Sequence, residues 1–427
     1  MNSKTLVIGL IIFGLFLTAL ITRNGDIAWM MLPFLSYLGA GILQTPVLEK
    51  VRFSATRTLE QNQSNGIVSV DVNLTIQNQA LETACLFIDE KVQAGMKITD
   101  GELRQWVTLR SGEQAELKYT FNVLRGNFSW DCIRTVVSDP LNLIETEMFL
   151  PASAMIQIRP QIKKFKAISF RSHSTLHSPG SIPARLGGSG TNFYGVREYQ
   201  TGDSLRRLDW RLTARHPRKF FTKEFEQEEI AEIGLLLDAR QCTELRVGEE
   251  SLFESCVGAT ASLAEMFLHQ GHRVGLLVFG ETMLNTFPGY GKTQLHRIMG
   301  CLSKAKVEAE DRTPASLDFI PIRIFPSHAL IVIISSTTSA DWSLFLRLRA
   351  YGYQVLLVSP DPIDFAYPTL AEDVTNHLAV RTARLERRLR LNNIAQLQIP
   401  VVDWRVSQPL FPLVRNALTR SRGQREK

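Results

Sequence analysis

Residues 194–238 read YGVREYQTGDSLRRLDWRLTARHPRKFFTKEFEQEEIAEIGLLLD, and this stretch decides how the chain is organised. Its first half is dense in arginine, aspartate and glycine and contains one tryptophan. Its second half passes through a charged strand into the apolar run Ile233–Asp238, which ends on an aspartate. A short continuous apolar run of this kind is typical of a strand buried on both faces of a parallel sheet.

The first half of this stretch combines turn, helix and ion-pair signals. Asp203 or Ser204 follows a turn sequence and can cap a short helix, and Leu205, Leu208 and Leu212 recur at helical spacing. Arginine forks match carboxylates with two hydrogen bonds, so the segment is an internally paired connector or a docking surface that presents a fork to an acidic partner or a phosphate, with nucleic-acid binding as a further alternative. The residues singled out for one role or the other are Gly195, Arg197, Glu198, Tyr199, Gly202, Asp203, Arg206, Arg207, Asp209, Trp210 and Arg215.

The pattern GVREYxxGDSLRRLDWRxTAR, followed by an FxxExE strand and LLLD, resembles the signature of the domain-of-unknown-function family numbered fifty-eight. The resemblance is strong from Gly187 to Asp238. It implies a bacterial or archaeal membrane protein with a von Willebrand factor A-like domain. It also implies a partnership with MoxR-type AAA ATPases, which are often encoded nearby. It does not imply an established biochemical activity.

Length and composition narrow the class of protein. A chain of 427 residues is long enough for two or three domains. A net charge of +6 suits the inner leaflet of a membrane, and nucleic-acid binding does not follow from it. The five cysteines contain no CxxC pair, so neither zinc nor thioredoxin chemistry is indicated, and reduced cytosolic thiols are the simplest interpretation.

Two apolar runs, Leu6–Thr22 and Ile27–Leu43, open the chain. Each is about 17 residues long, at the short end of what spans a bilayer. The Asn24-Gly25 pair between them favours a tight turn, so residues 1–46 are predicted to form a hairpin of two transmembrane helices. A cleaved signal peptide and a buried core hairpin are the alternatives.

The basic residues that flank these runs set the expected orientation. Positive charges before the first run and after the second favour both ends on the cytoplasmic side, which predicts a two-span protein of the cytoplasmic membrane with the bulk of the chain in the cytoplasm. The flanking residues are Lys4, Lys50, Arg52 and Arg57.

Three further regions are predicted. Residues 47–162 contain alternating runs such as Ile67–Ile76 and Ala115–Val123, which indicate an immunoglobulin-like β-sandwich. Residues 163–232 form a connector that carries the Arg/Asp/Trp motif. Residues 233–427 alternate strands and helices, which predicts a doubly wound α/β domain with any ligand at the carboxyl ends of its strands.

The expected elements of that last domain follow from its apolar runs. Strands are expected over Ile233–Asp238, Val274–Phe279, Ala329–Ile334, Gln354–Val358 and Val401–Trp404, with a short hairpin near Met283–Phe287. Helices are expected over Ser251–His269, Thr293–Ser303, Trp342–Tyr351 and Pro409–Thr419.

The metal site that the resemblance implies is degenerate in this chain. A von Willebrand A-type site uses DxSxS after the first strand, a threonine from a second loop and an aspartate after a later strand. Here Arg240 and Cys242 replace both serines, and Ser335-Ser336-Thr337, after the Ala329–Ile334 strand, contain no aspartate where the pattern expects one. We therefore expect no bound metal, with Asp238 and Thr293 as vestigial ligands. The segment ending Gly291-Lys292-Thr293 lacks the first glycine of a phosphate-binding loop, so no nucleotide cofactor is expected.

A basic helical stretch lies near the end of the chain. We interpret it as a solvated helix face, with contact to anionic lipid or to an acidic partner as the alternatives. Its arginines are Arg381, Arg384, Arg387, Arg388 and Arg390.

These patterns contain no catalytic signature. They predict a membrane-anchored, non-enzymatic interaction protein that works with a MoxR-type AAA ATPase in the assembly or remodelling of protein complexes. The alternative is a metal-dependent ligand-binding module that uses an unconventional ion site at Asp238 and Thr293.

Overall fold

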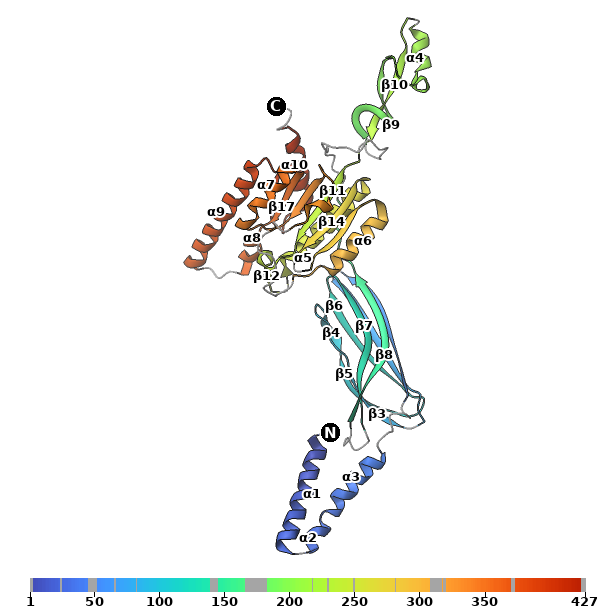
Figure 1. Cartoon of the computed structure of the whole chain (residues 1–427), viewed down its shortest axis with the longest axis vertical. Helices are drawn as coiled ribbons and strands as arrows, with labels where there is room; N and C mark the ends of the chain where they lie inside the picture. Colours follow the sequence, from blue (N-terminus) through green and yellow to red (C-terminus); the bar gives the residue numbers. More distant parts are fainter. Residues whose placement is uncertain are drawn as a thin grey trace. The chain divides into compact units, whose positions relative to one another are not determined.

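The computed structural model describes residues 3–23, 25–44, 52–64, 67–81, 83–138, 145–165, 183–216, 218–228, 230–248, 250–280, 282–307, 317, 320–369 and 373–423 (Figure 1). The chain divides into two compact units, Met1–Ile158 and Arg159–Lys427.

The first unit begins with apolar helices. Helix α1 spans Ser3–Thr22, and its window Thr5–Thr22 is long and apolar enough to cross a membrane, with none of it buried inside the structure. The second apolar run forms two helices, α2 (Gly25–Trp29) and α3 (Leu32–Gln44), because Pro33 cannot continue a preceding helix. With 13 residues, α3 rises only about 20 Å, less than the ~30 Å hydrocarbon core. One helix among the described residues therefore passes the length test for a span.

The rest of the first unit is made of two antiparallel four-stranded sheets. Their orders are β1-β2-β6-β4 and β5-β3-β7-β8. Leu74 and Leu117 of the first sheet share one apolar core with Leu86 and Ile133 of the second, so the sheets pack face to face. The strands are β1 Phe53–Ser64, β2 Ile67–Asn78, β3 Ala84–Asp89, β4 Lys97–Gly101, β5 Arg104–Leu109, β6 Gln114–Val123, β7 Gly126–Ser138 and β8 Glu145–Ile158.

The second unit holds a six-stranded sheet of order β15-β14-β11-β16-β17-β18, in which only β15 is antiparallel. The expected alternation of strands and helices is present. The strands are β11 Glu232–Asp238, β14 Arg273–Phe279, β15 Leu284–Gly289, β16 Leu330–Ile334, β17 Gln354–Pro360 and β18 Val401–Trp404. The helices are α5 Leu252–His269, α6 Gly291–Lys304, α7 Trp342–Ala350, α8 Pro362–Ala366, α9 Val374–Gln396 and α10 Leu410–Gly423.

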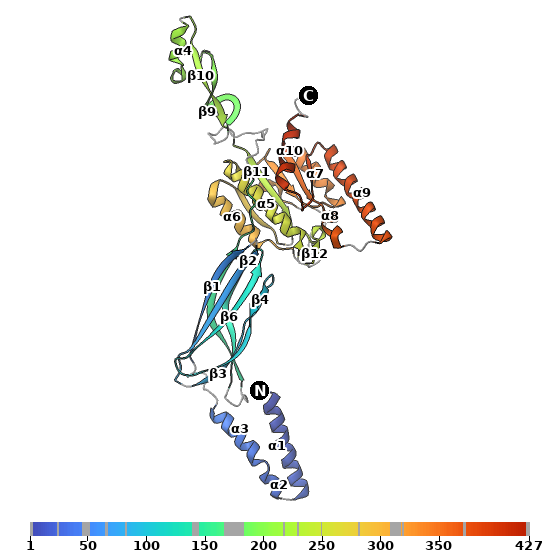
Figure 2. The same ribbon diagram turned by 180° about the vertical axis from the view of Figure 1, so that it is seen from behind.

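Helices cover both faces of this sheet. Leu235 and Leu237 of β11 pack in one core with α5, α6 and α10, whereas Leu236 faces the core formed with α7 and α9 (Figure 2). The strand order reverses between β11 and β16. After β11 the chain first adds β14 on one side of it, and then adds β16 on the other side. Ligands of open α/β sheets bind at the carboxyl ends of the strands at such a point.

A separate two-stranded ribbon precedes β11. Strand β9 (Pro183–Glu198) pairs antiparallel with β10 (Phe221–Glu228). Between them lie the short helices η1 (Leu205–Arg207) and α4 (Trp210–Arg215). We call residues 195–224 the finger; they contain the whole Arg/Asp/Trp motif.

A buried histidine gives the α/β unit a predicted pH dependence. His272 is 4% exposed, and its Nδ1 accepts a hydrogen bond of 3.2 Å from the Ala231 N–H. Burial lowers the pKa of His272 from 6.5 to about 4. Below pH 6.5 the unfolded chain binds a proton at this histidine, whereas the folded chain binds it only near pH 4. The contribution of the neutral histidine to the free energy of unfolding is therefore complete above pH 6.5 and is lost as the pH falls to 4. The loss is about 3 kcal/mol.

The test is chemical denaturation of the detergent-solubilised chain between pH 7 and 4. His272→Asn keeps an acceptor for the Ala231 N–H and removes the titrating group. We expect a flatter pH profile in the variant over this window. The same slope in both proteins would show that His272 is not the titrating group.

Candidate functional site

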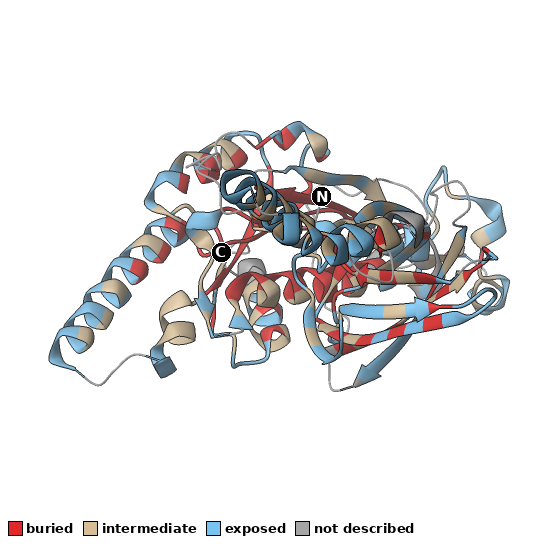
Figure 3. Cartoon of the chain, turned by 90° about the horizontal axis from the view of Figure 1, so that it is seen from below, coloured by how far each residue is buried: buried red, intermediate tan, exposed pale blue. Residues whose placement is uncertain are grey.

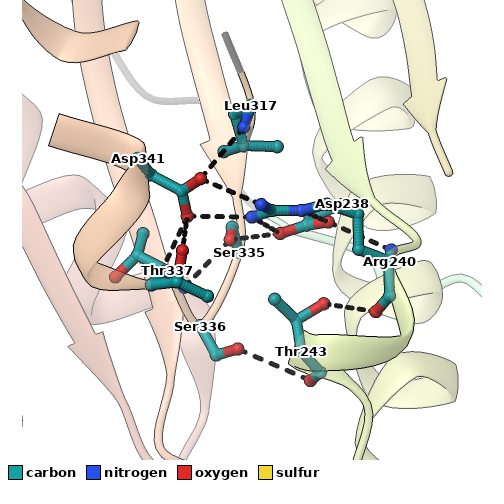
Figure 4. Close-up of polar contacts among 9 residues, drawn as sticks. Asp238, Arg240, Thr243, Leu317, Ser335, Ser336, Thr337 and Asp341 are labelled. Atoms are coloured by element: carbon teal, nitrogen blue, oxygen red, sulfur yellow. Dashed lines mark hydrogen bonds and ion pairs between the residues drawn. The ribbon is translucent and has the colours of Figure 1, made fainter. Parts of the chain in front are cut away.

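A buried arginine lies between two aspartates at the carboxyl edge of the sheet, where the strand order reverses (Figure 4). Asp238 ends β11, and Arg240 follows it. The Arg240 Nε and Nη2 donate to the two oxygens of Asp238 at 2.9 and 2.8 Å. Its Nη1 and Nη2 donate to the two oxygens of Asp341 at 2.9 and 2.8 Å. All three side chains are 0% exposed.

Neighbouring loops complete the hydrogen bonding of both carboxylates. The Ser335 hydroxyl donates to Asp238 Oδ2 at 2.6 Å. The Thr338 N–H and hydroxyl donate to Asp341 Oδ2 at 2.7 and 3.0 Å, and the Leu317 N–H donates to Asp341 Oδ1 at 3.0 Å. The cluster thus joins the loop after β11, the loop after β16 and the segment at Leu317.

Electrostatics keep Arg240 and Asp341 charged at neutral pH. Burial pulls the pKa of Arg240 down, but the hydrogen bonds and charges of the two aspartates outweigh it and raise that pKa above its ordinary value. Burial likewise tends to raise the pKa of Asp341, but its bonds to Arg240 and to backbone N–H groups hold that pKa below 3.8. The guanidinium is therefore a permanent cation between two carboxylates.

A divalent metal ion does not fit this arrangement. The carboxylate and hydroxyl oxygens of Asp238, Asp341 and Ser335 are the ligands that a hard cation takes, but the Arg240 guanidinium already occupies the space between them. Within the described residues, no group of three or more His, Cys, Asp or Glu side chains could hold a metal ion. Ser335, Ser336 and Thr337 supply no aspartate after β16, but Asp341 of the following helical turn brings a carboxylate to Arg240. The Thr338/Asp341 capping box was the signal that could have revealed it.

The structure does not bring the two vestigial ligands together. Gln294, next to Thr293, donates to the Val274 carbonyl at the start of β14. Asp238 pairs with Phe279, at the other end of β14. Five residues of strand, roughly 17 Å, separate these positions, so Thr293 lies at the amino edge of the sheet and Asp238 at the carboxyl edge.

Within the finger, one part of the motif is an internal scaffold. Arg197 donates to both oxygens of Asp203 at 2.8 Å and to Glu224 at 2.7 Å. Hydrogen bonds from Arg197 lower the pKa of Asp203. Ser204 stands at the N-cap of η1 without a side-chain hydrogen bond, and Asp209 caps α4 by accepting from two of its N–H groups. These contacts fix the finger from within.

Other motif residues support the same scaffold. Glu198 pairs with Lys219, and the Tyr199 ring lies 6.4 Å from that of Phe220. Gly202 has φ +111°, a turn conformation that favours glycine. Gly195 pairs with Glu224 in the ladder of the finger.

The remaining motif residues face outward. Leu205 and Trp210 are each 66% exposed. Arg206, Arg211 and Arg215 are exposed and have no ion-pair partner among the described residues, whereas Arg207 is half-buried and has a contact. The motif therefore combines an ion-paired scaffold with a surface of apolar and cationic side chains. The sequence pattern alone could not show which motif residues belong to the scaffold and which to the exposed surface.

The comparison with known proteins places the finger and the Arg240 cluster in one matched region. Residues 195–392 match the family model described as protein of unknown function DUF58. The DUF58-matching region begins at the finger and ends within α9, so it contains the scaffold, the exposed surface and the Asp238–Arg240–Asp341 cluster.

Curated relatives resemble the same part of the chain. The uncharacterized protein YeaD of Bacillus subtilis (strain 168) is 27% identical over 278 residues, which cover 62% of this chain and 65% of that protein. The uncharacterized protein Rv1480 of Mycobacterium tuberculosis (strain ATCC 25618 / H37Rv) is 26% identical over 190 residues, covering 42% of this chain and 57% of that protein. The chain thus spans less than two thirds of these relatives.

Solved structures resemble about a quarter of the chain. A FixG-related protein from Vibrio parahaemolyticus is 14% identical, covers 24% of this chain and 95% of its own, and has a TM-score of 0.17. The putative ApaA protein from Bordetella pertussis is 17% identical, covers 25% and 94%, and has a TM-score of 0.18.

The Arg240 cluster yields a stability prediction for the DUF58-matching region. Arg240→Ala leaves two buried carboxylates facing each other, and breaking a buried ion pair costs about 3–5 kcal/mol. Arg246→Ala is the matched control: it lies in the same segment between β11 and α5, but its side chain is 72% exposed, so its pair with Glu244 is worth at most about 1 kcal/mol. Hydrogen exchange of the β11 amides in the full chain reads out the difference. Equal protection in both variants would contradict the structural role of Arg240.

Removing the guanidinium also predicts a new metal dependence. In Arg240→Ser, two carboxylates and the Ser335 hydroxyl remain as oxygen ligands for a hard cation. We expect millimolar Mn²⁺ to raise the melting temperature of this variant and to leave the wild type unchanged, because only the variant binds the ion in its folded state. Adding Asp341→Asn to the variant should abolish the shift. A Mn²⁺ shift in the wild type would show that the native chain already has a metal site.

Proposed function

We propose that this chain is a membrane-anchored adaptor without catalytic activity, and that the finger is its docking surface. The observation that carries this proposal is the exposure of Trp210 and Leu205 beside arginines that have no ion-pair partner among the described residues, on a scaffold fixed by its own ion pairs. Tryptophan and arginine are the side chains most enriched where partners bind tightly. A scaffold that is already ordered also lowers the entropy lost on binding.

Charge favours an acidic partner. Between residues 195 and 224 the chain has six arginines and two lysines against four carboxylates. Arg197 is paired with Asp203 and Glu224, whereas the exposed Arg206, Arg211 and Arg215 have no ion pair within the part of the chain that the structure describes. Opposite charge on the partner would speed encounter and fix its orientation.

The Arg240 cluster supports docking through the finger and not through a metal ion. Metal-dependent capture of a partner requires a bound metal cation with an open coordination position. Here the guanidinium of Arg240 already pairs with both carboxylates that would hold such a cation. The distance between Asp238 and Thr293 gives no support to the alternative of an unconventional ion site.

The resemblance of the motif to the family numbered fifty-eight supplies the identity of the partner and the wider architecture in this proposal. The partner is a MoxR-type AAA ATPase, and the complex assembles or remodels other proteins. The face-to-face sheets are immunoglobulin-like, and the six-stranded sheet is a von Willebrand A-like domain. Helix α1 is one membrane span, α2 and α3 together are the second, and the bulk of the chain lies in the cytoplasm.

A pull-down of the detergent-solubilised chain, with and without ATP, tests this proposal. We expect the wild type to capture an AAA ATPase, identified by mass spectrometry, and Trp210→Ala to lose it. Trp106→Ala is the matched control, because Trp106 is also exposed, at 51%, but lies on β5. Asp209→Ala is unsuitable because Asp209 caps α4, and its loss would disturb the scaffold.

Two outcomes would contradict the proposal. Equal capture by Trp210→Ala and the wild type would place the contact outside the finger. Capture of no AAA ATPase in either nucleotide state would remove the proposed partner.

A further inference from the structure

A cavity of about 1040 Å³ lies along the open edge of the six-stranded sheet. Strand β18 is an edge strand, paired only with β17. Helix α9 packs against one face of the sheet through Leu391 and Ile394, and α10 packs against the other through Val414. The long helix at the left of Figure 3 is α9, and most of its surface is exposed. Residues of α9, β18 and α10 line the cavity, which is far from the finger in sequence.

The cavity is lined by a buried arginine with spare donors. Arg387 is only 4% exposed. Its Nη2 donates to the Ser359 carbonyl at 3.1 Å and to Asp403 at 2.7 Å. Its Nε lies 3.6 Å from Asp361, beyond hydrogen-bond distance, and neither Nε nor Nη1 has an acceptor in the described part of the chain. Buried donors without acceptors lose the hydrogen bonds that water would give them, so such groups usually mark a missing partner.

Further arginines make the cavity cationic. Arg384, Arg388 and Arg405 are exposed and line it, and the Arg384 guanidinium stacks 5.4 Å from the centre of the Tyr367 ring. The two carboxylates in the lining are Asp361 and Asp403, and both already pair with Arg387. Three exposed guanidinium groups are therefore available to an incoming anion.

The edge strand adds backbone donors. The Pro400 carbonyl accepts a hydrogen bond from the Leu357 N–H of β17, and the Trp404 carbonyl accepts one from the Asp361 N–H just after β17. Because alternate residues of a parallel strand face the neighbouring strand, the N–H groups of Val401 and Asp403 face the open edge. Both residues line the cavity.

We propose that this cavity binds a phosphate-bearing small molecule. Arginine forks match phosphate oxygens with paired hydrogen bonds, and three exposed forks around one cavity suit a ligand with several acceptor oxygens. The volume is that of a site for a small molecule of metabolite size. The phosphate could belong to a soluble metabolite or to a lipid headgroup, and the chemistry of recognition is the same. This site is independent of the adaptor function proposed for the finger.

The test is isothermal titration of the detergent-solubilised full chain at constant ionic strength. Sodium pyrophosphate is the probe for a soluble ligand, and dihexanoyl phosphatidylglycerol is the probe for a headgroup. We expect saturable binding of at least one probe. Arg388→Ala should weaken it at least tenfold. Arg381→Ala should leave it within about twofold, because Arg381 is an exposed arginine of the same helix that does not line the cavity.

Each outcome decides the proposal. Saturable binding of either probe that Arg388→Ala weakens and Arg381→Ala retains supports it, and the tighter probe identifies the source of the phosphate. Absence of saturable binding to both probes overturns it. Equal weakening by the two variants, or no weakening by Arg388→Ala, overturns it as well, because the anion would then bind the general charge of α9 or another surface.

Discussion

One guanidinium holds together the carboxyl edge of the α/β sheet. Arg240 carries the only positive charge between Asp238 and Asp341 in the described cluster, and without it two buried like charges would repel each other in a medium of low dielectric constant. The segments that it joins come from the loops after β11 and β16, on the two sides of the strand reversal. The place where open α/β sheets usually receive a ligand is thus filled by the chain itself.

Much of the α/β unit could be predicted from sequence, because buried parallel strands leave continuous apolar runs. The runs at Ile233–Asp238 and Ala329–Ile334 are found in β11 and β16 with small shifts in their ends. Contacts between distant loops leave no such periodic signal, which is why Asp341 was missed. Thr293 was misplaced for a different reason: β15 runs antiparallel, so the chain returns to the amino edge before α6 begins.

Sequence also could not distinguish the roles of chemically identical side chains. Arg197, Arg206 and Arg387 have the same guanidinium, yet the first fixes a scaffold, the second is exposed and the third is buried. Burial depends on the tertiary neighbours of each residue and not on local composition. The second apolar run shows a similar limit, because composition alone did not locate the break between α2 and α3 next to Pro33.

The position of the finger in the chain has a mechanical consequence. Strand β10 ends at Glu228 and β11 begins at Glu232, so a pull on the finger tip passes through a few residues into β11. Strand β11 is hydrogen-bonded to β14 on one side and to β16 on the other. A force along its axis would load both ladders in shear, and many hydrogen bonds would resist together.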